Sequence, residues 1–228
     1  MKRYVLLFAA ALMIVAECSG DRDASRAGKN AVSIAEFAKW EFQGSGEVTV
    51  DETEDAVYMS EAEGSAGVTL VSPKSYGPDV TVRFDVKPAT FESVNVVILS
   101  ASDKNTGGDI QVPADYDGSF GFWTQGDVQN YIFAFHNAAH ERLPFIVRDP
   151  GMELLGEADS HVVKEDWHTV EISRSGSRLS MKVDGAVIVE VTDTSGEPLP
   201  GGKIGFRLRG TPDSVASAWF RNIVISER

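Results

Sequence analysis

The sequence has one cysteine and few basic residues, and each shortage excludes a class of protein. A single cysteine among 228 residues excludes an intrachain disulfide framework. The 21 lysines and arginines face 34 aspartates and glutamates, which leaves a net charge of −13. An acidic surface repels phosphate backbones, so nucleic acid is not an expected partner. The hydrophobic content of 43% excludes a disordered chain and is sufficient for a substantial core.

Several catalytic signatures are also missing from the sequence. The chain has no Gly-x-Ser-x-Gly nucleophile elbow, no phosphate-binding P-loop and no glycine-rich dinucleotide motif. No strand-like segment carries carboxylates in the Glu-x-Asp-x-x-Glu spacing, with which jelly-roll glycosidases place a nucleophile and an acid/base on one face. A hydrolase that works through paired carboxylates therefore has weak support.

The first residues have the pattern of an export signal. Lys2 and Arg3 precede an apolar run over residues 4–16, which is shorter than the roughly 20 residues that span a bilayer. Cys18 follows almost directly, and this arrangement resembles a bacterial lipoprotein signal. Glu17 departs from the small residue usual at its position.

From this pattern we expect a signal peptide over residues 1–17 and lipidation at Cys18. Residues 18–31 are rich in Gly, Ser and charge, which is typical of a flexible tether. The expected location is the cell envelope, with the lipid anchor as the only contact with the membrane. Plain secretion is the alternative.

From residue 32 onward the sequence is a series of short β-branched segments bounded by Gly, Pro, Asp or Ser, which is typical of strands. No helical stretch alternates with them, and this excludes parallel βαβ folds. No linker-like tract interrupts residues 32–228. We therefore predict one all-β domain over residues 32–228, an antiparallel β-sandwich of the jelly-roll type.

The strongest local signal is a predicted three-stranded meander over residues 167–191. Ser175-Gly176 and Asp184-Gly185 supply the positive φ angles that tight hairpin turns require. Trp167 and Ile172, on the first strand of this meander, are expected in the core.

The order of motifs resembles a known group of jelly rolls. The C-terminal third is similar to concanavalin A-like lectin/glucanase domains in its Trp167-His168-x-Val170-x-Ile172, Val183-Asp184-Gly185 and Gly201-Gly202-Lys203-Ile204-Gly205-Phe206-Arg207. Two further segments resemble the YesU-like family of these jelly rolls, Gly126-Asp127-Val128-Gln129-Asn130-Tyr131 and Val147-Arg148-Asp149-Pro150-Gly151-Met152. The resemblance spans residues 40–225 and implies a concanavalin A-like jelly roll from a polysaccharide-degradation system.

Candidate metal ligands are few, and no cofactor is expected. His136 and His140 have the i, i+4 spacing of a zinc pair, but that pair needs a helix, and this segment leaves a strand. Asp103, Asn105 and Asp109 could supply oxygen ligands to a structural calcium ion, although such Asp-Asn-Gly segments are more often simple turns.

Residues 109–148 are unusually rich in side chains that suit a sugar. Aromatic faces stack on the apolar faces of a pyranose, while amide, carboxylate and guanidinium groups satisfy its hydroxyls. The segment contains Tyr116, Phe120, Phe122, Trp123, Tyr131, Phe133 and Phe135, together with Gln125, Asp127, Asn130, His136, Asn137 and Arg148.

Strand alternation divides residues 131–137 between two faces. Tyr131, Phe133, Phe135 and Asn137 share one face, and we expect this face to be core because its aromatics would fill a sandwich interior. The other face, with His136, would then point outward to the sheet surface where related jelly rolls hold glycans.

Two functions remain open at this point. The first is an exported carbohydrate-binding protein for a poly- or oligosaccharide, with Trp123 as a stacking platform and Gln125, Asp127, Tyr116 and Asn137 as further ligand-binding residues. The alternative is a glycan-active enzyme, and a polysaccharide lyase before a hydrolase. Its base would be His136, its acid Tyr131 or Tyr116, and Arg148 would neutralise the substrate carboxylate.

Overall fold

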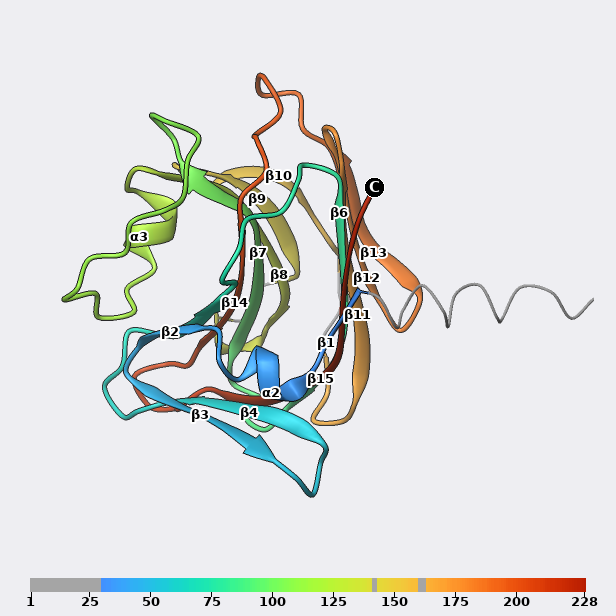
Figure 1. Cartoon of the computed structure of the whole chain (residues 1–228). Coiled ribbons are helices and arrows are strands. Elements are labelled where there is room, and N and C mark those ends of the chain that lie inside the picture. Colours follow the sequence, from blue (N-terminus) through green and yellow to red (C-terminus); the bar gives the residue numbers. More distant parts are fainter. Residues whose placement is uncertain (1–29, 141–142, 160–162) are drawn as a thin grey trace, which may run out of the picture. The chain divides into compact units, whose positions relative to one another are not determined.

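Two antiparallel sheets face each other in the structure, a computed structural model that describes residues 30–140, 143–159 and 163–228 (Figure 1). The expected signal peptide, Cys18 and all but the end of the tether lie outside these residues. The predicted antiparallel β-sandwich is confirmed. Within the described residues, no helix is long and apolar enough to cross a membrane.

The first sheet, sheet A, has the strand order β13-β12-β11-β6-β15-β4-β3, with β1 beside β15. Its strands are β1 (Ala31–Val32), β3 (Gly46–Asp51), β4 (Ala56–Glu61), β6 (Val80–Pro88), β11 (His168–Ser175), β12 (Arg178–Val183), β13 (Ala186–Thr192) and β15 (Ser217–Glu227).

The second sheet, sheet B, has the order β10-β9-β8-β7-β14-β5-β2. Its strands are β2 (Glu41–Gly44), β5 (Val68–Val71), β7 (Val94–Asp103), β8 (Val128–Asn137), β9 (Phe145–Asp149), β10 (Glu153–Glu157) and β14 (Lys203–Arg209). The described helical segments are all short: α2 (Ile34–Phe37), α3 (Gly121–Thr124) and the 3-10 turn η1 (Ala138–His140).

The predicted meander forms β11, β12 and β13. Gly176, Asp184 and Gly185 have φ angles of 57°, 50° and 80°, as the two hairpin turns require. Ile172 is fully buried, as expected. Trp167 is only partly buried and lies on the outer face of sheet A, where the Arg221 guanidinium stacks 3.8 Å from its ring centroid. The expectation that Trp167 is a core residue is therefore wrong.

The main core lies between the sheets and is rich in aromatic rings. Phe84 and Phe37 make edge contacts with Phe206 at centroid distances of 4.9 and 5.0 Å. The alternating rings of β8, Tyr131, Phe133 and Phe135, also join this core. Their predicted placement is confirmed, since three large rings at alternate positions fill the space between two sheets.

A second apolar cluster lies on the other face of sheet B, the face turned away from sheet A, which we call its outer face. Residues 104–127, the cover, include α3 and pack over part of this face (Figure 1). The cover contributes Ile110 and Trp123, and the sheet contributes Ile98, Ile132 and Val147. The outer face is therefore partly a second core, and a ligand can reach only the part that the cover leaves open.

Candidate functional site

A β-bulge in β8 decides which of its side chains can reach a ligand. Val96 pairs with Ala134 but Asn95 pairs with His136, so β8 contains one residue more than β7 at this point. The extra residue reverses the alternation beyond it. Asn137 therefore lies on the face of Val94, and His136 on the face of Asn95.

The bulge therefore changes the face of sheet B on which His136 lies. His136 is fully buried, and its Nε2 lies 2.8 Å from the Phe91 carbonyl oxygen. The expectation of an outward-facing His136 is wrong, because alternation counted along one strand cannot reveal a bulge that is defined by its neighbour. Alternation placed Asn137 on the face expected to be core, although Asn137 was also a candidate ligand-binding residue; in the structure it lines a pocket.

This pocket lies on the outer face of sheet B, next to the cover, and has a volume of about 330 Å³. Two cross-strand rows form its floor. One row contains Arg207, Val96 and, beyond Ala134, Phe145, and the next contains Arg209, Val94 and Asn137. Phe120 from the cover and Met152 from the turn between β9 and β10 also line it.

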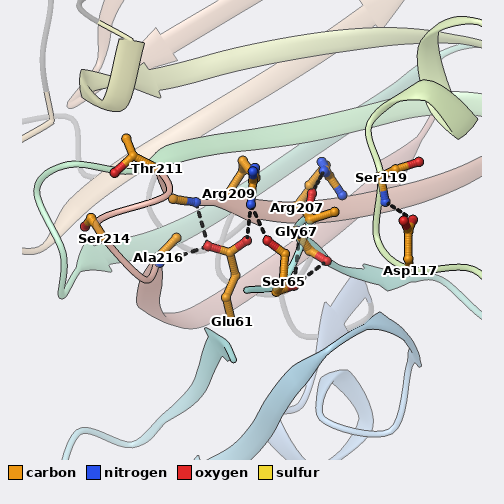
Figure 2. Close-up of polar contacts among 12 residues, drawn as sticks. Glu61, Ser65, Gly67, Asp117, Ser119, Arg207, Arg209, Thr211, Ser214 and Ala216 are labelled. Carbon is orange, nitrogen blue, oxygen red and sulfur yellow. Dashed lines mark hydrogen bonds and ion pairs between the residues drawn. The ribbon is translucent and has the colours of Figure 1, made fainter. Parts of the chain in front are cut away.

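The two arginines in the pocket differ in how their charges are balanced. Arg209 lies 3.4 Å from the Glu61 carboxylate, and it donates to the Ser65 carbonyl oxygen (Figure 2). Glu61 is itself buried and accepts hydrogen bonds from the backbone N–H groups of Gly210 at 2.6 Å and Ala216 at 3.0 Å. Arg209 is therefore one half of an anchored ion pair.

Arg207 has only neutral partners. Its guanidinium donates to the Ala66 carbonyl oxygen at 2.9 Å and to Thr69 Oγ1 at 3.3 Å, and lies beside the Tyr116 hydroxyl. No carboxylate of the described residues comes within 4.0 Å of it. Burial lowers the pKa of Arg207, because the charged form loses its hydration.

Glycines hold the Arg207 guanidinium in place. A Cβ atom added to Gly67 would overlap the guanidinium, and one added to Gly118 or Gly44 would overlap the Gly67 carbonyl oxygen. Gly67 also has a φ of 126°, which L side chains rarely adopt. The Phe120 ring completes the enclosure with its centroid 5.1 Å from the guanidinium carbon. Arg207 is thus packed against both backbone and an aromatic ring.

Trp123 and Tyr116 belong to the interior of the cover. Trp123 is fully buried and donates from Nε1 to the Tyr116 hydroxyl at 3.0 Å, and that hydroxyl donates to the Ser119 carbonyl oxygen at 2.9 Å. Burial raises the pKa of Tyr116. The expectation that Trp123 is an exposed stacking platform is therefore wrong. The Tyr116 hydroxyl lies beside the Arg207 guanidinium.

Gln125 and Asp127 are exposed on the cover and do not line the pocket. Asp127 pairs with Lys104 at 2.8 Å. Of the calcium candidates, Asp103 accepts the backbone N–H groups of Asn105 and Thr106 in a turn, and Asp109 accepts a hydrogen bond from the Ser75 hydroxyl. Within the described ranges, no group of three or more His, Cys, Asp or Glu side chains is arranged to hold a metal ion. A structural calcium ion remains a prediction.

Tyr131 and Arg148 meet on the inner side of sheet B, away from His136. Tyr131 donates to Asp193 Oδ2 at 2.6 Å, and Arg148 donates to the same oxygen. Burial, followed by the bond to Asp193, raises the pKa of Tyr131 to about 12. This network ties β8 and β9 to the segment after β13. The expected trio of His136, Tyr131 and Arg148 is therefore not assembled into one site.

Comparison with known proteins now identifies the family. Residues 32–226 match the model of the 3-keto-alpha-glucoside-1,2-lyase-like domain. The chain belongs to this family. The jelly-roll superfamily expected from the sequence is thereby supported, whereas the YesU-like family is not confirmed. No curated protein sequence matches the chain.

Solved structures share the fold of this 3-keto-alpha-glucoside-1,2-lyase-like domain. A Bacillus subtilis protein of unknown function with a galectin-like fold has a TM-score of 0.75 and 18% identity, over 85% of this chain and 91% of that one. The carbohydrate-binding module CBM66 from Bacillus subtilis has 0.56 and 13%, over 82% and 96%. Bacillus licheniformis β-glucanase also has 0.56 and 13%, over 87% and 98%. At these identities the likeness concerns the fold alone.

Neither Arg207 nor Arg209, the arginines of this family member's pocket, is among the site residues predicted from the sequence. Arg207 and Arg209 are two positions apart in the segment Lys203-Ile204-Gly205-Phe206-Arg207-Leu208-Arg209, so both side chains leave one face of β14. Alternation of Phe206 and Leu208 with two arginines was the available signal. This alternation indicates one apolar face and one cationic face, and the cationic face requires groups that can accept hydrogen bonds or carry negative charge.

Proposed function

We propose that this protein binds a sugar in the pocket on the outer face of sheet B. The observation that carries the proposal is the composition of the lining. Phe120 and Phe145 offer aromatic surface for the apolar face of a pyranose, and Asn137 and Arg207 offer polar groups for its oxygens. A volume of about 330 Å³ falls within the range of small-molecule sites.

The family and the solved structures support this proposal. The family description names a 3-keto-alpha-glucoside, which is a sugar derivative. A carbohydrate-binding module and a β-glucanase share the fold, and fold likeness raises the prior for a sugar ligand without assigning one.

Lyase activity is the second candidate, and the family description favours it. In a 3-keto-α-glucoside, the C2 proton is acidic because C2 is next to the C3 carbonyl. A base removes this proton, a C1–C2 double bond forms, and the C1–oxygen bond breaks to release an alcohol, which takes up a proton. Among the described residues that line the pocket, none is a carboxylate or a histidine that could serve as the base. Binding is therefore the function that the geometry supports best.

The test is calorimetric titration of the full-length protein with methyl α-glucoside and its 3-keto derivative. Asn137→Leu removes the pocket amide at similar volume, and Asn105→Leu on the exposed part of the cover is the control. We expect weaker binding, by about tenfold, only for Asn137→Leu, because one hydrogen bond contributes about 1 kcal/mol or more. Equal affinity in all three proteins would remove this pocket as the binding site.

The same samples separate binding from catalysis. Elimination from the 3-keto sugar produces a conjugated enone, which absorbs in the ultraviolet, whereas binding leaves the spectrum unchanged. A steady rise in absorbance that depends on protein concentration would establish the lyase instead.

We also propose that the protein binds its sugar outside the cytoplasm. The N-terminal pattern of Lys2, Arg3, the apolar run and Cys18 supports an exported protein that is anchored in the cell envelope by a lipid.

A further inference from the structure

Arg207 stands out among the arginines because it is 2% exposed, lines the pocket and has no carboxylate partner among the described residues. Arg148 pairs with Asp193, and Arg209 pairs with Glu61. Arg174 is equally buried, but it donates to Ser100 and to the carbonyl oxygens of Gly176, Leu199 and Pro200. Arg207 donates to the Ala66 carbonyl oxygen and to the Thr69 hydroxyl, and its third partner is the Tyr116 hydroxyl, so its charge has no anionic partner.

An uncompensated buried charge is unfavourable, and buried charges in proteins are therefore normally paired. Arg207 is 2% exposed and nevertheless lines the pocket. The pocket is therefore the place where Arg207 can meet a further group. An anionic group on the ligand would supply the partner that Arg207 lacks.

The surroundings of Arg207 are built to keep the guanidinium in one position. Gly67 lies directly against it, and the Phe120 ring centroid lies 5.1 Å from its central carbon. Figure 2 shows Arg207 beside Gly67 and separate from the Glu61–Arg209 pair. A fixed guanidinium loses little entropy when it binds a carboxylate, which it can contact through two parallel N–H groups.

We propose that the ligand of this pocket is a sugar that carries a carboxylate, and that Arg207 pairs with this group. The inference rests on the proposed sugar-binding function and adds the chemical class of the sugar, a uronic acid or its glycoside. Asn137 and Phe145, on the other side of the floor, then face the ring and its hydroxyls. The protein has a net charge of −13 and therefore disfavours anions on most of its surface. An anionic sugar should accordingly bind in this pocket and not elsewhere.

The experiment compares matched sugars on the full-length wild-type protein by calorimetry at low salt. The pairs are the methyl glycosides of glucose and glucuronate, of galactose and galacturonate, and of mannose and mannuronate. We expect at least one uronate to bind about tenfold or more tightly than its neutral partner, as a charge-assisted pair requires.

Arg207 variants assign the preference to this side chain. Arg207→Met should remove most of the difference between the two members of a pair, and Arg207→Lys should retain part of it, since the charge remains without the planar fork. Arg178→Met is the control, because Arg178 is exposed on sheet A and pairs with Glu190. Should Arg207→Met fail to fold, the wild-type comparison and Arg207→Lys still decide the matter.

The outcomes separate this inference from the proposed function. Equal affinity for neutral and acidic sugars overturns the carboxylate and leaves sugar binding intact. Preference for the 3-keto glucoside or for glucose 6-sulfate over every uronate also overturns it. Failure of all these sugars to bind overturns both proposals, and a uronate preference that survives in Arg207→Met assigns the carboxylate to another residue and overturns the role of Arg207.

Discussion

Asp149 should make the stability of the fold fall as the pH rises, which is the reverse of an ordinary carboxylate. It is 1% exposed at the end of β9, and burial raises its pKa to about 6 from 3.8, partly opposed by the hydrogen bond from the Met152 N–H. Its Oδ2 has no hydrogen-bond partner among the described residues, and neither has Oδ1 of Asn130, its cross-strand neighbour. Protonation of Asp149 removes the charge whose burial is unfavourable.

The sign follows from proton linkage. The folded state holds this proton more tightly than the unfolded state, so the contribution to stability is complete below pH 4 and is lost as the pH rises through 6. With roughly 1.4 kcal/mol for each pKa unit, the free energy of unfolding should fall by about 3 kcal/mol from this group.

The assay is urea unfolding at several pH values between 4 and 8 for the wild type, for Asp149→Asn and for Asp115→Asn, an exposed control. Asparagine imitates the neutral carboxyl, so Asp149→Asn should gain about 3 kcal/mol relative to the wild type as the pH rises through this range. Contributions from the other carboxylates are common to the proteins and cancel in the difference. Parallel curves for the wild type and Asp149→Asn would refute the assignment of a buried, protonated Asp149.

Three further changes test the lipid anchor, the packing of Gly67 against Arg207, and the hydrogen bond between Tyr131 and Asp193. Cys18→Ala should move the protein from the detergent phase to the soluble fraction or block its processing, and wild-type protein that begins at another residue would contradict lipidation. Gly67→Ala should weaken sugar binding and lower the melting temperature, while Gly64→Ala, at a residue that also has a positive φ but open space around it, should change only the melting temperature. Tyr131→Phe should lower the free energy of unfolding by about 1–3 kcal/mol with unchanged sugar affinity, since its bond to Asp193 lies outside the pocket; a change in affinity would place Tyr131 in the site.

Local sequence patterns were sufficient wherever the structure depends on neighbours along the chain. The Asp184-Gly185 turn was predictable because two positive φ angles in succession favour these residue types. The placement of Tyr131, Phe133 and Phe135 was predictable because strand alternation and aromatic volume both favour the interior.

The tertiary structure alone decided the position of the site. The bulge that exchanges His136 and Asn137 is defined by pairing with β7, some forty residues away in the sequence. The burial of Trp123 depends on the cover packing back onto sheet B, and an aromatic ring in a sequence looks the same whether it is exposed or buried. Arg207 meets Phe145 and Asn137 only through the order of strands β14-β7-β8-β9. Long-range pairing sets this register, and it is not encoded in any single segment.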